Sequence, residues 1–367
     1  SLEDLQNATV EDVKTFFRKW YVPNNTTLVL SGDLDIDQAT EWVHKYFDEI
    51  PRGEEITPLE KRPGVVNETK KLYYEDNFAR LPELTLTWPT VESFHEDSYA
   101  LDVLSSYLSR GKNAPLNQVL VDDLKITSFP RMYNRTSELA GEMQLAVRAF
   151  KGEDLDEVLE GINLAMAKFE TEGISQKDLE RIKAGQETNF YRSLSSVLGK
   201  GTRLASYNTY INDPGYVTED INKTLAVTTE DVMRVYNKYI KDKNFIATSF
   251  VPKNGKEMAL ENSVEAEVVE EQIVIGKEEA FDASMTATYE KTPSSFDRSV
   301  EPSYGKAPEV KTPEVWQDEL ENGMDVYGIM NDEVPLVQFN IVIDGGQLVE
   351  SMDKLGVANL TAQLMEK

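Results

Sequence analysis

The 367-residue chain contains no cysteine and only two histidines. Without cysteine it can form neither disulfide bonds nor thiolate metal sites. A zinc site built from other side chains needs three or four ligands that converge on one point. His44 and His95 lie in different parts of the chain, and neither has a second histidine or a carboxylate at a known metal-binding spacing. We therefore predict that neither histidine holds a metal.

Basic residues are scarce relative to acidic ones. The chain has 38 lysines and arginines against 65 aspartates and glutamates, which gives a formal net charge of −27. Nonspecific nucleic-acid binding requires lysine and arginine at the phosphates, so we expect no nucleic-acid partner. The acidic excess favours solubility. It leaves open a second interpretation, in which an acidic surface or chamber receives basic ligands.

Long apolar runs and the common catalytic motifs are also missing. No apolar stretch approaches the roughly 20 residues of a membrane-spanning helix, and no signal peptide is recognisable. The sequence contains no P-loop, no GxGxxG and no GxSxG motif. The residue pattern alone therefore predicts no membrane span and shows no active site.

What the chain does contain is an internal repeat. Residues 9–32 align with residues 228–251 without a gap, at an offset of 219. Each copy opens with a threonine followed by aspartate three residues later, as in a capping box. Apolar residues at helical spacing and a β-rich run complete each copy. Helix, turn and strand form the expected end of an α/β or α+β module, so the chain contains related modules of domain size.

The beginnings of two modules repeat as well. Residues 81–86 and 334–339 share an apolar residue, a proline and the same apolar alternation. We expect the tail of one module, all of a second and the head of a third. Strands are predicted at residues 26–31, 72–75, 81–88, 143–150, 245–251, 326–330 and 337–343. Helices are predicted after an N-cap at Asp35, at residues 155–172, from 175 to about 198, at 203–211 and from about 354.

Changes in composition indicate the domain boundaries. The stretch before residue 70 is charged and rich in proline and glycine, and residues 259–312 are acidic and then rich in Ser, Thr and Pro. We predict the end of a first domain at residues 1–56, a linker at 57–70, a second domain at 71–258, an acidic connector at 259–312 with one short strand at 272–275, and the beginning of a third domain at 313–367.

One pair of side chains is a candidate for substrate binding. Arg203 and Tyr210 are seven residues apart, which places them two turns apart on one face of a predicted helix. An arginine and a tyrosine so placed can stabilise an oxyanion or hold a substrate carbonyl. A packed tyrosine beside a surface arginine explains the same spacing.

The repeat and its neighbours resemble the M16 peptidases, which include insulin-degrading enzyme, pitrilysin and the mitochondrial processing peptidase. The resemblance rests on the two closing units, on ALDVLSSYLSRGKNAPLNQVLVDD from residue 100, on GISQKDLERIKAGQETNF from residue 173, and on residues 320–365. It covers nearly all of the chain outside the acidic connector. It implies tandem α+β domains of the LuxS/MPP-like metallohydrolase type, each a mixed antiparallel sheet flanked by helices, which enclose a chamber.

In this family, zinc is held by an inverted H-x-x-E-H helix and a downstream glutamate, and the motif's own glutamate activates water. The resemblance places this motif ahead of the aligned residues. In the third module the corresponding positions are Asn359, Ala362 and Gln363, none of which can replace the motif's residues. It also matches Arg203 and Tyr210 to a pair that assists catalysis, although that pair comes from the last domain in single-chain members. We expect zinc in the full-length enzyme and none bound to this chain.

The resemblance implies metal-assisted hydrolysis of peptides or unfolded polypeptides, with this chain supplying chamber wall and substrate contacts but no metal. The expected partners are the substrate and either the remaining domains of the same protein or a homologous subunit. Two alternatives stay open: a non-catalytic scaffold comparable to the core subunits of respiratory complex III, and a module that binds peptide at a sheet edge without metal. We expect a bacterial periplasmic location only by analogy with other members of this family.

Overall fold

The computed structural model describes residues 7–268, 293–301, 304–307 and 311–365, together with residues 5 and 309. The chain divides into two compact units, Ser1–Thr312 and Pro313–Lys367. The short strand predicted at 272–275 lies outside the described residues. Within the described part of the chain, no helix is long and apolar enough to cross a membrane.

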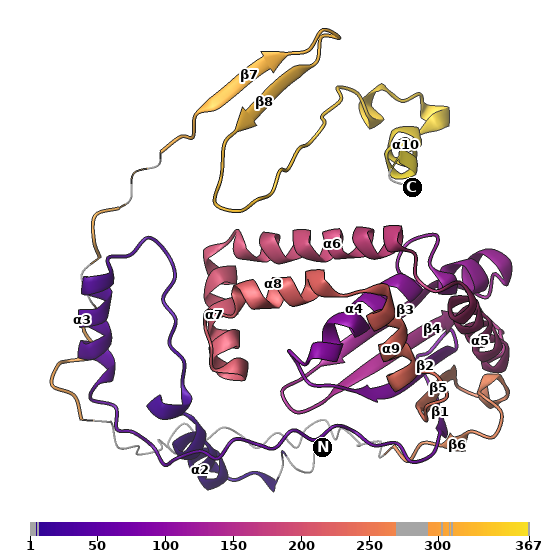
Figure 1. Ribbon diagram of the computed structural model, residues 1–367, viewed down its shortest axis with the longest axis horizontal. Helices are drawn as coiled ribbons and strands as arrows, with labels where there is room; N and C mark the ends of the chain where they lie inside the picture. The colour runs from indigo at the N-terminus through magenta and orange to yellow at the C-terminus, as the bar shows by residue number, and fades with distance from the viewer. Residues whose placement is uncertain are drawn as a thin grey trace. The chain divides into compact units, whose positions relative to one another are not determined.

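The larger unit is built on a six-stranded sheet with the order β3-β4-β2-β5-β1-β6 (Figure 1). β2 is antiparallel to β4 and β5, β3 is antiparallel to β4, and β1 is parallel to β5 and β6. The strands are β1 (Lys70–Asp76), β2 (Glu83–Thr90), β3 (Thr127–Thr136), β4 (Gly141–Ala149), β5 (Ile246–Pro252) and β6 (Val264–Glu265). A mixed sheet with flanking helices is the α+β class that the repeat predicts.

Alternation along the central strands decides which face of the sheet becomes the core. Leu84 and Leu86 of β2 are buried, as are Leu145 and Val147 of β4, while the residues between them are more exposed. Successive side chains of a strand point to opposite faces. One face is therefore apolar and covered by helices, and the other is polar.

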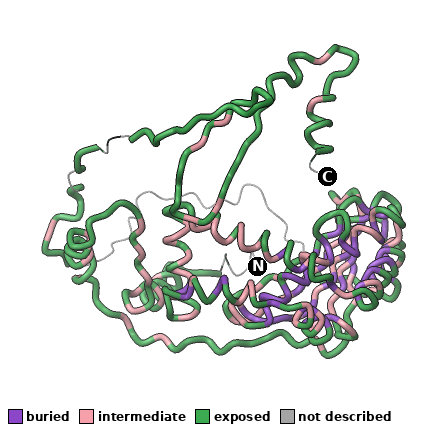
Figure 2. Tube along the Cα trace, turned by 45° about the horizontal axis from the view of Figure 1, so that its top comes forward, coloured by how far each residue is buried: buried purple, intermediate pink, exposed green. Residues whose placement is uncertain are grey.

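Three helices cover the apolar face, and three more extend the layer beside them (Figure 1). α4 (Glu96–Ser109), α5 (Leu155–Glu172) and α9 (Thr229–Tyr239) contact the sheet. α6 (Gln176–Leu194) and α8 (Val217–Ala226) pack beside α4 and against each other, and α7 (Val197–Ile211) packs against α6. A π-helical turn, Asn117–Asp123, follows α4. Buried residues gather where the sheet meets the helices (Figure 2).

The helix predicted from residue 175 forms as α6, but its predicted end near residue 198 is wrong, because α6 ends at Leu194 and α7 begins at Val197. Ser196 has an extended backbone and caps α7, since its Oγ accepts a hydrogen bond from the Gly199 amide at 3.0 Å. A Cβ at Gly199 would lie only 1.8 Å from the Ser193 carbonyl oxygen. The local serine cap therefore ends one helix and begins the next.

The two copies of the repeat form the same helix in different surroundings. α2 (Val10–Trp20) and α9 both begin with a threonine–aspartate capping box. Val232 and Val235 of α9 are fully buried against the sheet and α4. The equivalent apolar face of α2 is exposed to solvent, since Phe16 is 59% exposed and Phe17 is 57% exposed. Local capping therefore specifies the helix, whereas burial of its apolar face depends on a partner surface.

The strands predicted at 26–31 and 337–343 are not formed among the described residues. Both segments lack a backbone ladder partner there, whereas β5 in the second copy of the repeat lies between β1 and β2. Residues 26–31 make side-chain contacts instead, such as the 2.8 Å bond from Asn208 Nδ2 to Thr27 Oγ1. A β-rich run becomes a strand only where a neighbour supplies the hydrogen bonds.

The smaller unit contains a hairpin and a helix among its described residues. β7 (Val315–Glu319) pairs antiparallel with β8 (Asp325–Ile329), close to the strand predicted there. α10 (Val357–Met365) follows near the end of the described chain, where the sequence predicts a helix. The α3 helix of the larger unit (Ile36–Phe47) begins, as predicted, at an Asp35 cap.

A buried carboxylate joins α4 to α9. Asp97 Oδ2 accepts hydrogen bonds from Lys238 Nζ at 2.7 Å and from Tyr239 Oη at 2.6 Å, and its Oδ1 pairs with Arg234. Burial opposes ionisation, but these donors outweigh it and hold the pKa of Asp97 well below its usual range. A lowered folded pKa stabilises the protein above the unfolded pKa of about 4, and that contribution is lost as the pH falls through acid values.

We expect Asp97→Asn to destabilise the packing of α4 on α9 by about 2 to 3 kcal/mol, because it leaves Lys238 without its counter-charge and removes one of the two carboxylates that pair with Arg234. Peptide-resolved hydrogen exchange would then show both helices exchanging about 30- to 100-fold faster at neutral pH. Glu96→Gln is the matched control, because it removes an exposed acid from the same turn. Equal exchange rates in the two variants would contradict the stabilising role of Asp97.

Candidate functional site

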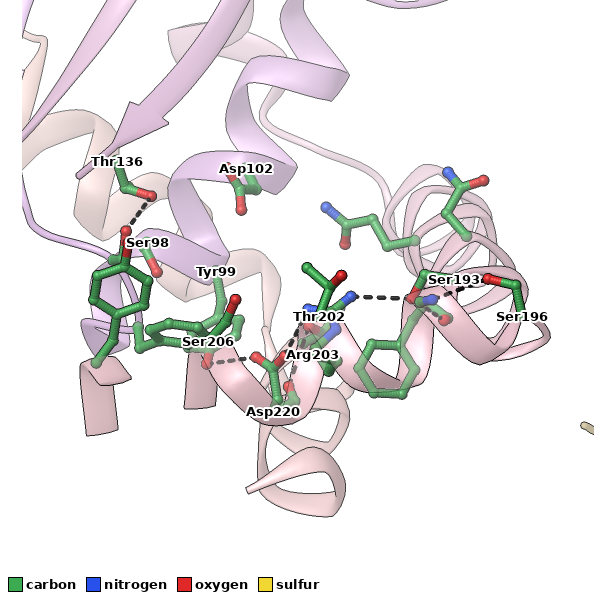
Figure 3. A pocket seen from close by; sticks show the side chains of 18 of the residues that line it. Ser98, Tyr99, Asp102, Thr136, Ser193, Ser196, Thr202, Arg203, Ser206 and Asp220 are labelled. Atoms are coloured by element: carbon green, nitrogen blue, oxygen red, sulfur yellow. Dashed lines mark hydrogen bonds and ion pairs between the residues drawn. The ribbon is translucent and has the colours of Figure 1, made fainter. Parts of the chain in front are cut away.

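A cavity of about 940 Å³ opens beside α4, where α6, α7 and α8 meet it (Figure 3). Hydroxyl and amide side chains form much of its wall. Its charged side chains are Asp102, Arg203 and Asp220, and its aromatic ones are Phe94, Tyr99, Phe190 and Tyr210. Such a mixture of ring faces and convergent polar groups is typical of ligand sites.

Asp220 of α8 organises one end of the cavity. Its buried carboxylate accepts hydrogen bonds from Tyr99 Oη at 2.9 Å and from Tyr207 Oη at 2.6 Å. It also forms an ion pair with Arg203 at 3.5 Å, and Figure 3 shows it between Tyr99 and Arg203. One carboxylate thus connects α4, α7 and α8.

The two tyrosines of this network are held as neutral donors. Burial, followed by the charge and hydrogen bond of Asp220, raises the pKa of Tyr99 and that of Tyr207 above their usual range. A phenol that cannot ionise keeps its proton for the carboxylate. The network therefore retains its hydrogen bonds throughout the physiological pH range.

Arg203 is fixed in position by this network. Its guanidinium donates to Ser193 Oγ at 3.1 Å and lies over the ring of Phe190 at 5.2 Å from the centroid. Its side chain remains 30% exposed. A guanidinium has five N–H donors in a rigid plane, so Arg203 can be held by Asp220 and Ser193 and still offer donors to a ligand.

Tyr210 and Phe94 form an aromatic part of the wall. Tyr210 lies two turns after Arg203 and is 50% exposed, with its ring 6.4 Å from that of Phe94. Phe94 has a φ of +64°, in the left-handed region that a bulky residue rarely adopts. Its ring packs against Tyr207 and Tyr216, at 5.7 and 6.1 Å between centroids. Such packed, strained residues are common at binding sites.

Asp102 lies on α4, three residues after Tyr99 and so one turn further along the same helix face. Its carboxylate is exposed to the cavity and accepts a hydrogen bond from Asn134 Nδ2 of β3 at 3.1 Å. Surrounding protein raises the pKa of Asp102 to about 6, although Asn134 and Arg110 act in the opposite direction. Asp102 is therefore a carboxyl group that faces the cavity and has a neutral amide as its side-chain partner.

Comparison with known proteins identifies the fold and the family. The family model described as "Peptidase M16 inactive domain" matches residues 7–186. This match and the relatives below support assignment to the M16 peptidase family. A zinc protease of Helicobacter pylori, PqqE, is 27% identical over 249 residues, which are 66% of this chain and 54% of that protein. An uncharacterized zinc protease of Bacillus subtilis, YmxG, is 24% identical over 231 residues, 63% of this chain and 55% of that protein.

The structure of a protease from Helicobacter pylori has the same fold, with a TM-score of 0.60 at 24% identity, over 69% of this chain and 61% of the other. The chain spans about half the length of the curated relatives that it matches. Family and fold agree with the resemblance seen in the sequence.

The residues that the structure describes do not fit a zinc site. Asn359, Ala362 and Gln363, the positions that the resemblance assigns to the zinc motif, lie on α10 and offer neither an imidazole nor a carboxylate. His44 pairs with Asp48, and His95 caps α4 by accepting from the Asp97 amide. Among the described residues no group of three His, Asp or Glu side chains could hold a metal ion. No step of metal chemistry can therefore be assigned to these residues.

Of the residues predicted from sequence, the structure brings Arg203 and Tyr210 to one cavity. Sequence reasoning missed Asp102, Asp220 and Phe94. The acids in the first turn of α8 signal a helix beginning there, but no local pattern connects Asp220 with α4. The backbone strain at Phe94 leaves no signal in the sequence.

We expect Asp220→Asn to lower the stability of the larger unit by about 2 to 3 kcal/mol, because the amide cannot accept from both tyrosines and leaves Arg203 without its counter-charge. Denaturation followed by hydrogen exchange in α4, α7 and α8 would measure this loss. Glu219→Gln changes the neighbouring exposed acid and should cost less than about 0.5 kcal/mol. Similar losses in the two variants would contradict the role given to Asp220.

We also expect the dialysed 367-residue chain to contain less than about 0.1 equivalent of zinc, because no converging ligand set is visible in its sequence. Inductively coupled plasma mass spectrometry of the purified protein measures this directly. A value near one equivalent would mean that a histidine or a carboxylate cluster forms a zinc site after all.

Proposed function

We propose that this chain is a non-metal part of an M16 zinc peptidase and that its larger unit contributes substrate-binding wall. The substrates are peptides or unfolded polypeptides. The observation that carries the proposal is the cavity in which Arg203, held by a buried carboxylate, and the exposed ring of Tyr210 share one wall. Both residues stay available to a ligand in an otherwise ordered site.

The lining chemistry suits an extended peptide. Backbone carbonyls need donors, which the remaining N–H groups of Arg203 and the hydroxyl of Tyr210 supply. Backbone amides need acceptors, which the serine and threonine hydroxyls and the Asn189 side chain supply. Contacts to the backbone are independent of sequence, so this wall would hold many peptides.

The relatives support the hydrolytic part of this proposal. Two of them carry the name zinc protease, and each is about twice as long as the segment it shares with this chain. We propose that zinc and the water-activating glutamate are supplied outside these residues, by other domains of the same protein or by a homologous subunit. The domain assignment of 1–56, 71–258 and 313–367 as parts of three M16-like domains belongs to the same proposal.

The proposal predicts that Tyr210→Ala weakens peptide binding about tenfold, which is about 1.4 kcal/mol. The measurement is fluorescence anisotropy of a labelled, unstructured peptide of about 15 residues, titrated with the 367-residue chain. The control is Tyr304→Ala, which removes a 91% exposed tyrosine outside the cavity and should leave binding unchanged. If the two variants bind equally well, the cavity is not the peptide site.

A further inference from the structure

The three charged residues of the cavity are not equivalent. Arg203 and Asp220 neutralise each other at 3.5 Å, and Asp220 is further satisfied by two tyrosine hydroxyls. Asp102 has no ion pair within 4.0 Å among the described residues, and its side-chain partner is the neutral amide of Asn134. The cavity therefore holds one carboxylate whose negative charge is not compensated by a contacting cation.

The surroundings of Asp102 favour a cationic ligand. Figure 3 shows its carboxylate directed into the space between α4 and the helices opposite. Hydrogen bonds between a carboxylate and an ammonium or guanidinium group are stronger than neutral ones, and the gain is larger where water is partly excluded. The rings of Phe94 and Tyr210 bound the same cavity and can attract a cation over their faces.

We infer that Asp102 selects a basic side chain, lysine or arginine, in the peptide that occupies this cavity. This inference rests on the proposed function, because it names the substrate feature that the same cavity recognises. Asp102 would be a specificity residue, whereas Arg203 and Tyr210 hold the peptide backbone. The uncompensated acid and the compensated arginine thus perform different tasks in one site.

The ionisation of Asp102 adds a pH dependence. The groups that face it are Arg110 on its own helix, Asp220 on α8 and the neutral Asn134 on β3. Its raised pKa of about 6 means that the protonated, neutral form is substantial at pH 5. A cationic ligand binds the ionised form, so affinity for a basic peptide should rise between about pH 5 and pH 7.

The test uses three labelled peptides of about 15 residues that differ only at the central position, which is lysine, norleucine or glutamate. We expect the 367-residue chain to bind the lysine peptide about tenfold more tightly than the norleucine peptide at pH 7, and less so at pH 5. Asp102→Asn should abolish this ratio and its pH dependence while binding of the norleucine peptide is unchanged. Asp102→Glu should keep a preference for lysine.

The matched control is Glu219→Gln, which changes the net charge of the chain by the same amount at an exposed position outside the cavity. It should keep the full preference for lysine. If the preference persists in Asp102→Asn, it arises from the overall acidity of the chain and the inference is wrong. If the wild-type chain binds all three peptides equally, this inference fails and the proposed function stands. If it binds none of them, both fail.

Discussion

The arrangement around the cavity depends on one buried carboxylate that must be satisfied. Asp220 lies away from water, where an unpaired charge would cost several kcal/mol. The carboxylate of Asp220 is instead stabilised by hydrogen bonds from Tyr99 of α4 and Tyr207 of α7 and by an ion pair with Arg203 of α7. Because these donors come from two helices and the carboxylate from a third, satisfying the charge also fixes where the three helices meet. The cavity lies beside that junction, and the same hydrogen-bond network fixes the positions of residues in its wall.

The sequence predicts those features of the fold that are local. Threonine–aspartate capping boxes and apolar residues at helical spacing specify α2 and α9 equally well, and both helices form. Strands obey a different rule, since their hydrogen bonds come from elsewhere in the chain. Among the residues that the structure describes, the run at 26–31 therefore has no strand partner, although its counterpart becomes β5. The sequence does not predict β3, because Pro130 interrupts its strand pattern. Pro130 is tolerated in this strand because β3 is an edge strand that pairs on one side only.

The same distinction separates the parts of the site. Arg203 and Tyr210 could be predicted together because a helix brings residues seven apart to one face. The partners of Arg203 could not, since Asp220 lies on another helix and reaches it only through the packing of α7 on its neighbours. Phe94 adopts a positive φ because surrounding rings hold it there, which is a property of the assembled structure. Membership of the M16 family was visible in the order and spacing of many segments, although no metal motif is present.

In the described part of the larger unit, where no cluster of metal ligands is found, two acidic residues have different roles. The buried carboxylate of Asp220 positions Arg203 through an ion pair. The carboxylate of Asp102, one turn after Tyr99, faces the cavity and accepts a hydrogen bond only from the neutral amide of Asn134 among the described side chains. A carboxylate whose charge is balanced by a cation of the same protein makes the site rigid. A carboxylate without such a cation can be neutralised only by a cation of the ligand. This difference in compensation, rather than the number of acids, is what turns a strongly acidic chain into a site that discriminates between ligands. Rigidity and selectivity come from the same residue type because the surrounding helices supply donors to one carboxylate and leave the other exposed.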